Sequence, residues 1–393
     1  MELESYEEPF GAKIFKLILY VIIGLLGVIG NILVCIVILK TAKLRSSTYY
    51  FICSLAIADI GVLLVCFSLA VIEQELLAEW PFGEGFCLYI YPATDTAFGA
   101  SIWSITVIAI ERYRVIVANR PKIITRNSKK RRYTWIVIAV VWLGNFLLAG
   151  IPLYVVIKYH EDSIKKVCYS EWKFKETLKT VYFLALTLVW YIIPLGIISF
   201  TYWAISRKIK ERAEFLARIG MRGPREAGDL GHDHTSLRHE HKNCLKRDAK
   251  AQRLLTPLVV VFAVTMFPIN LFRIIIISWY GFSEWEYYRL FYDIMIFFTI
   301  SNSAANPIIY TVVSNEFRTG FGNLLHLNQL KRCTDSQGDS GITNITNLSG
   351  IIKIITPQPR RKHQNEGGES ETFRRKKEDA NMVLSDNELV VKS

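Results

Sequence analysis

Seven long apolar runs constrain the fold of this chain more than any other feature of its sequence. Each run holds at least about 18 mostly apolar residues, enough for a helix to cross the roughly 30 Å of bilayer hydrocarbon. Of the 393 residues, 51% are hydrophobic, and the mean hydropathy is +0.25, a value that soluble domains rarely reach. The sequence therefore predicts an all-α membrane protein, a seven-transmembrane helix bundle. The runs are Leu17–Leu39, Tyr50–Ile72, Phe86–Ile110, Tyr133–Ile157, Leu178–Ile205, Leu254–Trp279 and Leu290–Val313.

The charges between the runs predict the orientation of the chain. The loops after the first and third runs are rich in Lys and Arg, with Lys129–Arg132 the densest cluster. The first eight residues carry four glutamates, and the loop from Glu73 to Glu84 carries four glutamates and no base. Because basic loops remain cytosolic, we expect the N-terminus outside the cell and the C-terminus inside. This topology, with attraction to anionic inner-leaflet lipid, accounts for the net charge of +12 without a nucleic-acid partner.

Three segments divide the chain under this topology. Residues 1–16 form an extracellular N-terminal tail. Residues 17–327 form the membrane domain, which includes a polar, basic cytosolic loop at 207–250. Residues 328–393 are polar and poor in aromatic side chains, so they are predicted to be a disordered cytosolic tail.

A short amphipathic segment at residues 315–327 is predicted to form an eighth helix. It places Phe317, Phe321 and Leu324 on one face, so it should lie along the inner membrane surface. Cys333, a few residues further on, is a candidate for palmitoylation there.

Two of the seven cysteines, Cys87 and Cys168, face the oxidising side in this topology. Cytosolic thiols stay reduced, so these two make one plausible disulfide, between the third run and the loop before the fifth. In that loop, β-prone stretches at 155–159 and 165–169 flank the polar turn His160–Ser163 and predict a hairpin. A hairpin held by a disulfide leaves the mouth of the bundle open for a large ligand.

Asp59 is the most costly polar residue within the apolar runs. It lies about nine residues from the cytosolic end of the second run, roughly 14 Å deep, where a carboxylate costs on the order of 3 kcal/mol. Ser101, Asn302 and Ser303 lie at a similar depth. These oxygen-bearing side chains fit a small cation site, a proton or water network, or a structural hydrogen-bond cluster. The cost of a buried carboxylate leads us to favour a functional site.

The sequence offers no catalytic constellation, so an enzyme is not predicted. None of the seven histidines lies in an apolar run. The four between His232 and His241 lack the spacing with cysteine that is typical of a metal site. A transporter or channel is a remote alternative, because the charged residues within the runs occur singly and no inverted repeat is evident.

Several motifs, each on its own run, together resemble the rhodopsin-like (class A) G-protein-coupled receptors, and most closely the neuropeptide receptor group. The resemblance covers Leu17 to about Leu325. It implies a bundle at the plasma membrane that binds ligand outside and a heterotrimeric G protein inside, with receptor kinases and arrestin as further partners. The matching residues are Gly30-Asn31, Leu55–Asp59, Trp80–Gly83, Cys87 with Cys168, Glu111-Arg112-Tyr113, Trp142, Pro194, Tyr202, Pro268, Asn306–Tyr310 and Phe317-Arg318.

The resemblance also assigns roles on the cytosolic side. Glu111 and Asp248 would hold Arg112 in the resting state, and outward movement of the sixth helix would free Arg112 for the G protein. Tyr202 and Tyr310 would then stabilise the active form. The full activation set is Glu111, Arg112, Tyr113, Tyr202, Asp248, Phe262, Pro268, Asn306, Pro307 and Tyr310. The Asp59 group would match the family's sodium pocket, the only non-protein component expected: Asp59, Ser101, Asn302 and Ser303.

One motif departs from the family pattern. The sixth run has Thr265-Met266-Phe267-Pro268 where the family usually has Cys-Trp-x-Pro. Met266 therefore replaces a tryptophan that changes position on activation. Phe262, one turn deeper, matches the family's transmission aromatic and is expected to carry the ligand signal.

The predicted ligand is a short, cationic neuropeptide, with amidated peptides as one class. Thr94 stands where amine receptors have an aspartate, and Asp95 is rotated from it by about 100° around the helix. An amine or other small ligand remains the alternative. Arg273 is expected either to meet an acidic group of the ligand or to pair with Asp293. The candidate ligand contacts are Asp95, Thr94, Phe98, Glu73, Glu171, Trp172, Asn270, Arg273 and Asp293.

Overall fold

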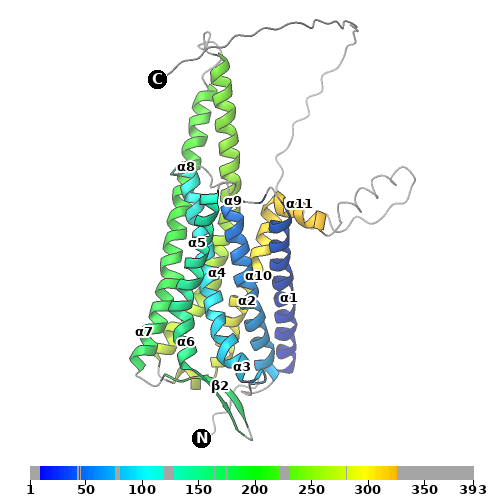
Figure 1. Cartoon of the computed structure of the whole chain (residues 1–393), viewed down its shortest axis with the longest axis vertical. Coiled ribbons are helices and arrows are strands. Elements are labelled where there is room, and N and C mark those ends of the chain that lie inside the picture. The colour runs from blue at the N-terminus through cyan, green and yellow to red at the C-terminus, as the bar shows by residue number, and fades with distance from the viewer. Residues whose placement is uncertain are drawn as a thin grey trace, which may run out of the picture. The chain divides into compact units, whose positions relative to one another are not determined.

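Seven helices that are long and apolar enough to cross a membrane form a bundle, and a short hairpin lies over one end of it (Figure 1). The computed structural model describes residues 9–41, 44, 46–75, 80–118, 128–162, 165–172, 176–221, 231–279 and 281–324. The long elements are α1 (Phe10–Lys40), α2 (Ser47–Glu75), α4 (Tyr91–Ile116), α5 (Ser128–Asn145), α7 (Glu176–Thr187), α8 (Ile193–Met221), α9 (Gly231–Ser278) and α10 (Tyr288–Val313). The short elements are α3 (Gly83–Gly85), η2 (Phe86–Ile90), η3 (Phe146–Gly150), α6 (Ile151–Val156), β1 (Ile157–Glu161), β2 (Lys166–Ser170), η4 (Leu188–Ile192), η6 (Phe282–Glu284) and α11 (Asn315–Leu324).

The third, fourth and fifth spans each contain one wide, π-helical turn, and a proline explains each of them. The turns η2, η3 and η4 end shortly before Pro92, Pro152 and Pro194. A proline has no N–H to donate, and its ring clashes with the carbonyl four residues earlier, which here lies inside the wide turn. The ladder of hydrogen bonds widens at that point, and the helix continues beyond it.

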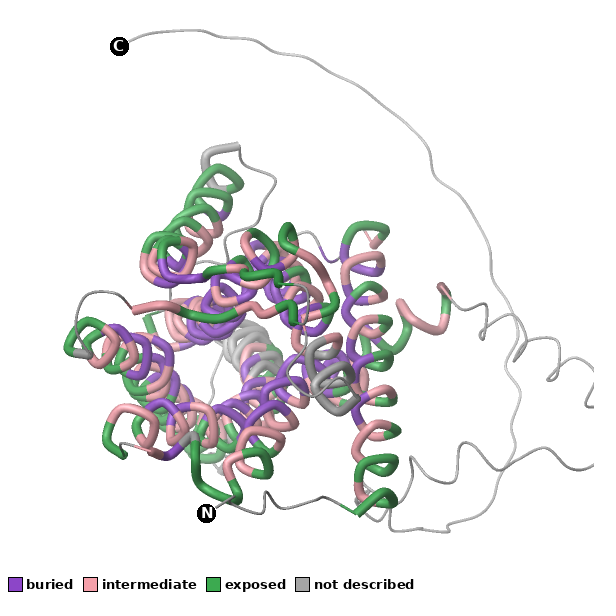
Figure 2. Tube along the Cα trace, turned by 90° about the horizontal axis from the view of Figure 1, so that it is seen from below, coloured by how far each residue is buried: buried purple, intermediate pink, exposed green. Residues whose placement is uncertain are grey.

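The bundle is lined with buried residues and coated with exposed apolar ones (Figure 2). Leu25, Ile136 and Val140 are more than half exposed, as expected where the surrounding solvent is lipid. Small residues let the helices approach closely inside: a Cβ added at Gly27 would lie 2.7 Å from Leu63 and 3.0 Å from Ala304. Such close approach is how membrane helices gain packing contacts without a hydrophobic driving force.

The predicted hairpin is present, as β1 and β2. The strands are antiparallel, with Ile157 opposite Ser170 and Glu161 opposite Lys166. Glu171 N–H donates to the Val156 carbonyl (2.7 Å) where the hairpin joins the bundle. The α11 helix occupies the place of the predicted amphipathic segment, and it buries Phe317.

The predicted cytosolic loop at 207–250 differs in the structure. Its described residues are helical, because α8 continues to Met221 and α9 begins at Gly231, so both helices extend beyond the bundle (Figure 1). The α8 extension alternates bases and acids at helical spacing: Glu211 contacts Arg207 and Lys208, each at 3.2 Å. Such pairs favour helix in a segment that is too polar to signal one by hydropathy.

Some predictions fall on residues outside the described part of the chain. These are the first half of the N-terminal tail, the whole C-terminal tail with Cys333, and the Glu73 side chain.

Candidate functional site

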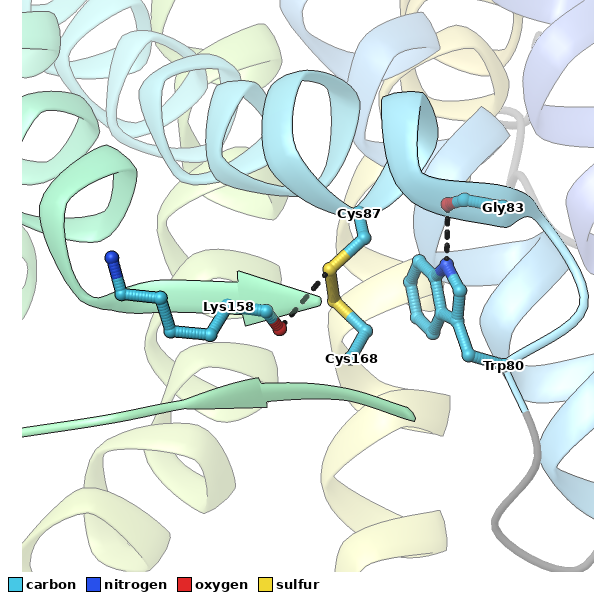
Figure 3. Close-up of a disulfide and its surroundings, with 5 residues drawn as sticks. All are labelled: Trp80, Gly83, Cys87, Lys158 and Cys168. Atoms are coloured by element: carbon cyan, nitrogen blue, oxygen red, sulfur yellow. Dashed lines mark hydrogen bonds between the residues drawn. A yellow bond between two sulfur atoms is a disulfide. The ribbon is translucent and has the colours of Figure 1, made fainter. Parts of the chain in front are cut away.

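A disulfide and an aromatic loop hold the hairpin over one end of the bundle (Figure 3). The predicted Cys87–Cys168 bond is present, with an S–S distance of 2.04 Å, and joins η2 to β2. Trp80 N–H donates to the Lys166 carbonyl (2.7 Å), and Trp80 Nε1 donates to the Gly83 carbonyl (2.9 Å). The φ of Gly83 is +75°, which a residue with a Cβ rarely adopts. The hairpin is therefore fastened along one edge.

The tip of the hairpin is closed by its own polar contacts. Glu161 accepts from Lys166 Nζ and from the Tyr159 hydroxyl, both at 2.7 Å. These two hydrogen bonds hold the pKa of the Glu161 carboxyl below its usual range. The exposed Glu161 carboxyl is thus held in its ionised form.

Arg273 is the centre of a buried group that we call the Arg273 cluster, made of Phe98, Trp190, Asn270 and Arg273. The guanidinium carbon lies 5.0 Å from the Trp190 ring centroid and 5.8 Å from that of Phe98. Its Nη1 donates to Asn270 Oδ1 at 3.4 Å. Arg273 is only 6% exposed, and Asp95 and Tyr182 also act on it electrostatically. Three predicted ligand contacts therefore meet, together with Trp190, which the sequence did not single out.

The other predicted ligand contacts are placed differently. Asp95 is partly exposed and interacts electrostatically with Arg273, whereas the Thr94 hydroxyl donates to the Ile90 carbonyl of its own helix (3.2 Å). The Trp172 ring packs at a tilt against Tyr182, with centroids 5.2 Å apart and an interplanar angle of 42°. Glu171 lies beside Trp172 and is partly exposed.

The predicted alternative pairing of Arg273 with Asp293 is wrong for the described residues. Asp293 pairs with Lys16 of α1, and the Tyr20 hydroxyl donates to the Asp293 carbonyl (3.1 Å). These contacts join the N-terminal parts of α1 and α10. Asp293 is therefore engaged with α1 in this structure.

The Asp59 carboxylate is fully buried and accepts hydrogen bonds on both oxygens. Ser101 Oγ donates to Oδ1 and Asn306 Nδ2 donates to Oδ2, each at 2.7 Å, and Ser303 is a further partner. Asn302 turns instead to α9, where its Oδ1 accepts from Thr265 Oγ1 (3.0 Å). The structure thus gathers three of the four residues predicted for this site, and it adds Asn306.

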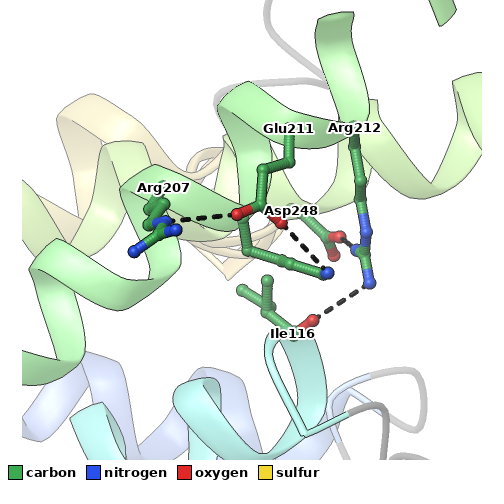
Figure 4. Close-up of polar contacts among 6 residues, drawn as sticks. Ile116, Arg207, Glu211, Arg212 and Asp248 are labelled. Atoms are coloured by element: carbon green, nitrogen blue, oxygen red, sulfur yellow. Dashed lines mark hydrogen bonds and ion pairs between the residues drawn. The ribbon is translucent and has the colours of Figure 1, made fainter. Parts of the chain in front are cut away.

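Polar contacts also join the helix ends opposite the hairpin, which are the predicted cytosolic ends (Figure 4). Asp248 of α9 pairs with Arg212 of α8, and Arg212 Nη2 donates to the Ile116 carbonyl at the end of α4 (3.0 Å). Glu111 lies 3.7 Å from Arg114 of its own helix. The role of Arg212 was missed because it lies in the part of the sequence interpreted as a loop.

A second contact at the same end of the bundle joins α9 to α11. Lys250 Nζ donates to Glu316 Oε1 (2.5 Å), and Ser314 Oγ donates to Glu316 Oε2 (2.9 Å). Partial burial opposes ionisation of Glu316, but these hydrogen bonds outweigh it and hold the pKa of the carboxyl below its usual range. Beside this contact, the Tyr310 ring stacks on Phe317 at 5.3 Å.

The remaining predicted activation residues lie along the middle and inner parts of the bundle. Phe262 is fully buried, and its ring centroid lies 6.3 Å from that of Tyr191. Pro268 and Pro307 lie inside α9 and α10. Tyr113 faces Phe200 at 6.0 Å, and Tyr202 is partly exposed.

Comparison with known proteins gives one family and a consistent group of relatives. The family model described as 7 transmembrane receptor (rhodopsin family) matches residues 30–310. Neuropeptide Y receptor type 2 of Homo sapiens is 30% identical over 316 residues, which cover 79% of this chain and 75% of that protein. The Gallus gallus protein of the same name is 31% identical over 327 residues, covering 81% and 77%. The RYamide receptor of Drosophila melanogaster is 27% identical over 347 residues, covering 85% and 69%.

Proposed function

The chain belongs to the rhodopsin family of seven-transmembrane receptors, and from this premise we propose that it binds an extracellular neuropeptide and activates a heterotrimeric G protein. The carrying observation is the hairpin, which is held by Cys87–Cys168 and Trp80 at one edge, and a hairpin fastened in this way suits a mouth that admits an extended ligand. The names of the relatives, which include neuropeptide Y and RYamide receptors, support the same ligand class.

The ligand that we propose is a short, cationic peptide, and peptides with an amidated C-terminus are the first to test. Asp95 and Glu171 are partly exposed acids near the mouth of the bundle, and acidic groups there draw a cationic ligand by electrostatic steering. Trp172, which is partly exposed, offers aromatic surface next to Glu171 in the chain, and Phe98 lines the Arg273 cluster. Arg273 lies deeper, where it complements an acceptor group of the peptide.

Activation follows from the contacts at the cytosolic ends of the helices. Outward movement of α9 about Pro268 separates Asp248 from Arg212 and opens the surface that includes Arg112. Tyr202 and Tyr310 then stabilise the open form, in which the G protein binds. Receptor kinases and arrestin act on the cytosolic face of the same receptor at the plasma membrane.

A peptide screen tests the ligand class directly. Cells that express the full chain are exposed to a library of short peptides, each made with an amidated and a free C-terminus, and to a panel of monoamines. Sensors for dissociation of each of the four Gα classes report activation. A response to amidated cationic peptides is expected, and a response to monoamines alone contradicts the proposal.

Asp95→Asn separates peptide from amine binding in the same assay. An amine ammonium depends on one carboxylate, so the substitution should abolish its response. A peptide has many contacts, so the substitution should only lower its potency. Abolished peptide potency at normal surface expression would place Asp95 at the centre of an amine-type site.

We further propose that a sodium ion stabilises the resting receptor at Asp59. Carboxylate and hydroxyl oxygens suit a hard cation, and Asp59, Ser101 and Ser303 would hold it. Among the described residues, Asn31 Oδ1 and the Tyr310 hydroxyl are buried without a hydrogen-bond partner, which supports a polar site extending beyond these contacts. Purified receptor should melt at a higher temperature in sodium chloride than in choline chloride. Asp59→Asn should remove the difference, and a sodium effect that survives it contradicts the proposal.

A further inference from the structure

The sixth span has a methionine two residues before Pro268, where the receptor family usually has a tryptophan, but a buried tryptophan of the fifth span contacts the sixth span at Arg273. Met266 occupies that position and is fully buried. Trp190 is also fully buried and lies in η4, the wide turn before Pro194. The large aromatic side chain beside α9 is therefore supplied by a neighbouring helix.

The contact between the two helices is a cation held on aromatic faces. The Arg273 guanidinium carbon lies 5.0 Å from the Trp190 ring centroid, and Phe98 meets the Trp190 ring edge-on at 5.4 Å. Among the described residues Arg273 makes no ion pair within 4.0 Å, although it is only 6% exposed. A buried cation is costly, and desolvated cation–π contacts are the ones that contribute most. Stacking on Trp190 is therefore a main stabilising contact of this guanidinium, together with the electrostatic attraction of Asp95.

A hydrogen bond to the fourth span fixes the indole of Trp190. Its Nε1 donates to Asn145 Oδ1 (2.8 Å), and Asn145 Nδ2 donates to the Val141 carbonyl (2.8 Å). Gly99 of α4 makes room, since a Cβ there would lie 2.7 Å from Trp190 Nε1. The indole is thus held by the fourth span and shaped by the third, so it offers a rigid surface to Arg273.

Arg273 is linked in turn to the backbone next to the proline of α9. Its Nη1 contacts Asn270 Oδ1, and Asn270 Nδ2 donates to the Met266 carbonyl (2.7 Å). Met266 lies two residues before Pro268. Movement of the guanidinium is therefore transmitted to the part of α9 where its hydrogen-bond ladder is interrupted.

We propose that Trp190 is a positioning residue that holds α9 in the resting arrangement by stacking on Arg273. A hydrogen-bond acceptor of the bound ligand draws the guanidinium off the indole, and α9 is then free to move. This inference rests on the proposed receptor function. It supplies from the fifth span the aromatic contact that the sixth span lacks.

Basal signalling without any ligand tests the proposal. The full chain carries an extracellular tag, so that the four Gα-class sensors are normalised to the amount of receptor at the cell surface. Trp190→Leu removes the aromatic face, Trp190→Phe keeps a weaker one, and Arg273→Gln removes the cation. Trp203→Leu is the matched control, because Trp203 lies on the same span, is 56% exposed and has Arg207 at 5.8 Å over its ring.

We expect Trp190→Leu and Arg273→Gln each to raise the ratio of active to resting receptor on the order of tenfold. Trp190→Phe should give a smaller rise, and Trp203→Leu no rise. The double variant Trp190→Leu with Arg273→Gln should match the single variants, because either change alone removes the contact. A purely structural role for Trp190 predicts effects that multiply, and that result overturns the proposal.

Two further measurements keep the test decisive. If Trp190→Leu does not reach the surface, Asn145→Ala removes only the anchor of the indole and should give a smaller basal rise. A bimane fluorophore on Cys244 of α9, with the other free cysteines replaced, reports helix movement in purified receptor without a G protein.

If peptides activate the parent chain but Trp190→Phe and Asn145→Ala behave like Trp203→Leu, the inference fails and the proposed function stands. If bimane emission shifts in Trp190→Leu while no sensor responds, the inference stands and the G-protein function fails.

Discussion

At the scale of single residues, Gly99 of α4 lies where the side chains of two other helices leave no room for a Cβ. A Cβ there would lie 2.0 Å from Asn145 Oδ1 and 2.7 Å from Trp190 Nε1. Gly99→Ala should displace both side chains and lower the free energy of unfolding by roughly 1–3 kcal/mol, as overpacking does. Thermal unfolding of purified receptor measures the change.

Gly144 and Gly196 provide the matched controls for that substitution. An added Cβ at either position meets nothing within 4 Å. Alanine there should be neutral or stabilise its helix by about 0.5–1 kcal/mol, because glycine is a poor helix former. Equal melting temperatures for all three alanine variants would show that the space around Gly99 is larger than the structure indicates.

The disulfide gives a second prediction at this scale. Cys87→Ser and Cys168→Ser should each lower stability by roughly 2–4 kcal/mol and reduce surface expression, because each frees the hairpin from η2. The double variant should match the single ones. Cys244→Ser, on the cytosolic side, is the control and should have little effect on either measurement. Additive losses would mean that the two cysteines act separately.

Single residues also show where sequence reasoning stops. The depth of Asp59 and Ser101 along their helices follows from counting, and the structure joins them at 2.7 Å. The contact of Asn302 with Thr265 depends on helix rotation, which counting along one helix does not fix. The same limit hid the stacking of Trp190 on Arg273, since the two lie on different helices.

At the scale of elements, the Lys250–Glu316 contact joins α9 to α11. The two side chains are 46% and 41% exposed, so the pair is worth at most about 1 kcal/mol. Glu316→Gln should therefore raise basal signalling by no more than about fivefold. Exchanging the two residues, Lys250→Glu with Glu316→Lys, should restore the basal level, and failure to do so argues against an ionic link.

The pH dependence of this contact follows from the lowered pKa of Glu316. A carboxyl with a lower pKa in the folded state adds stability above its unfolded pKa, near about 4.3. That stability is lost as the pH falls through the folded pKa. The difference in melting temperature between the parent chain and Glu316→Gln should thus be present at neutral pH and vanish in acid. A difference that grows in acid would contradict it.

Elements were predictable where hydropathy or turn chemistry marks them. The seven apolar runs gave the spans, and the β-prone stretches around a polar turn gave β1 and β2. The helical extensions of α8 and α9 were missed because they have no apolar periodicity and depend on charge pairs such as Arg207 with Glu211. The wide turns before Pro92, Pro152 and Pro194 were also missed, although each has a proline as its sequence signal.

At the scale of the whole molecule, orientation in the membrane remains a prediction. An epitope tag at the N-terminus should be detected on intact cells, and a tag at the C-terminus only after permeabilisation. The sequons at Asn344 and Asn347 should then stay unmodified, so glycosidase treatment should not change the mobility of the chain. A change in mobility that is traced to a glycan on either asparagine would place the C-terminal tail outside the cell and reverse the predicted topology.

The length of α9 has a mechanical consequence. Thirty-seven residues separate Pro268 from the start of the helix at Gly231, an arm of about 55 Å at 1.5 Å per residue. A rotation of about 5° at the proline would move Asp248 by about 3 Å and the far end by about 5 Å. The long helix therefore works as a lever, in which a small displacement near the ligand is amplified with distance. A partner that binds the far end of α9 therefore experiences a larger displacement and a smaller force than a partner that binds next to the bundle.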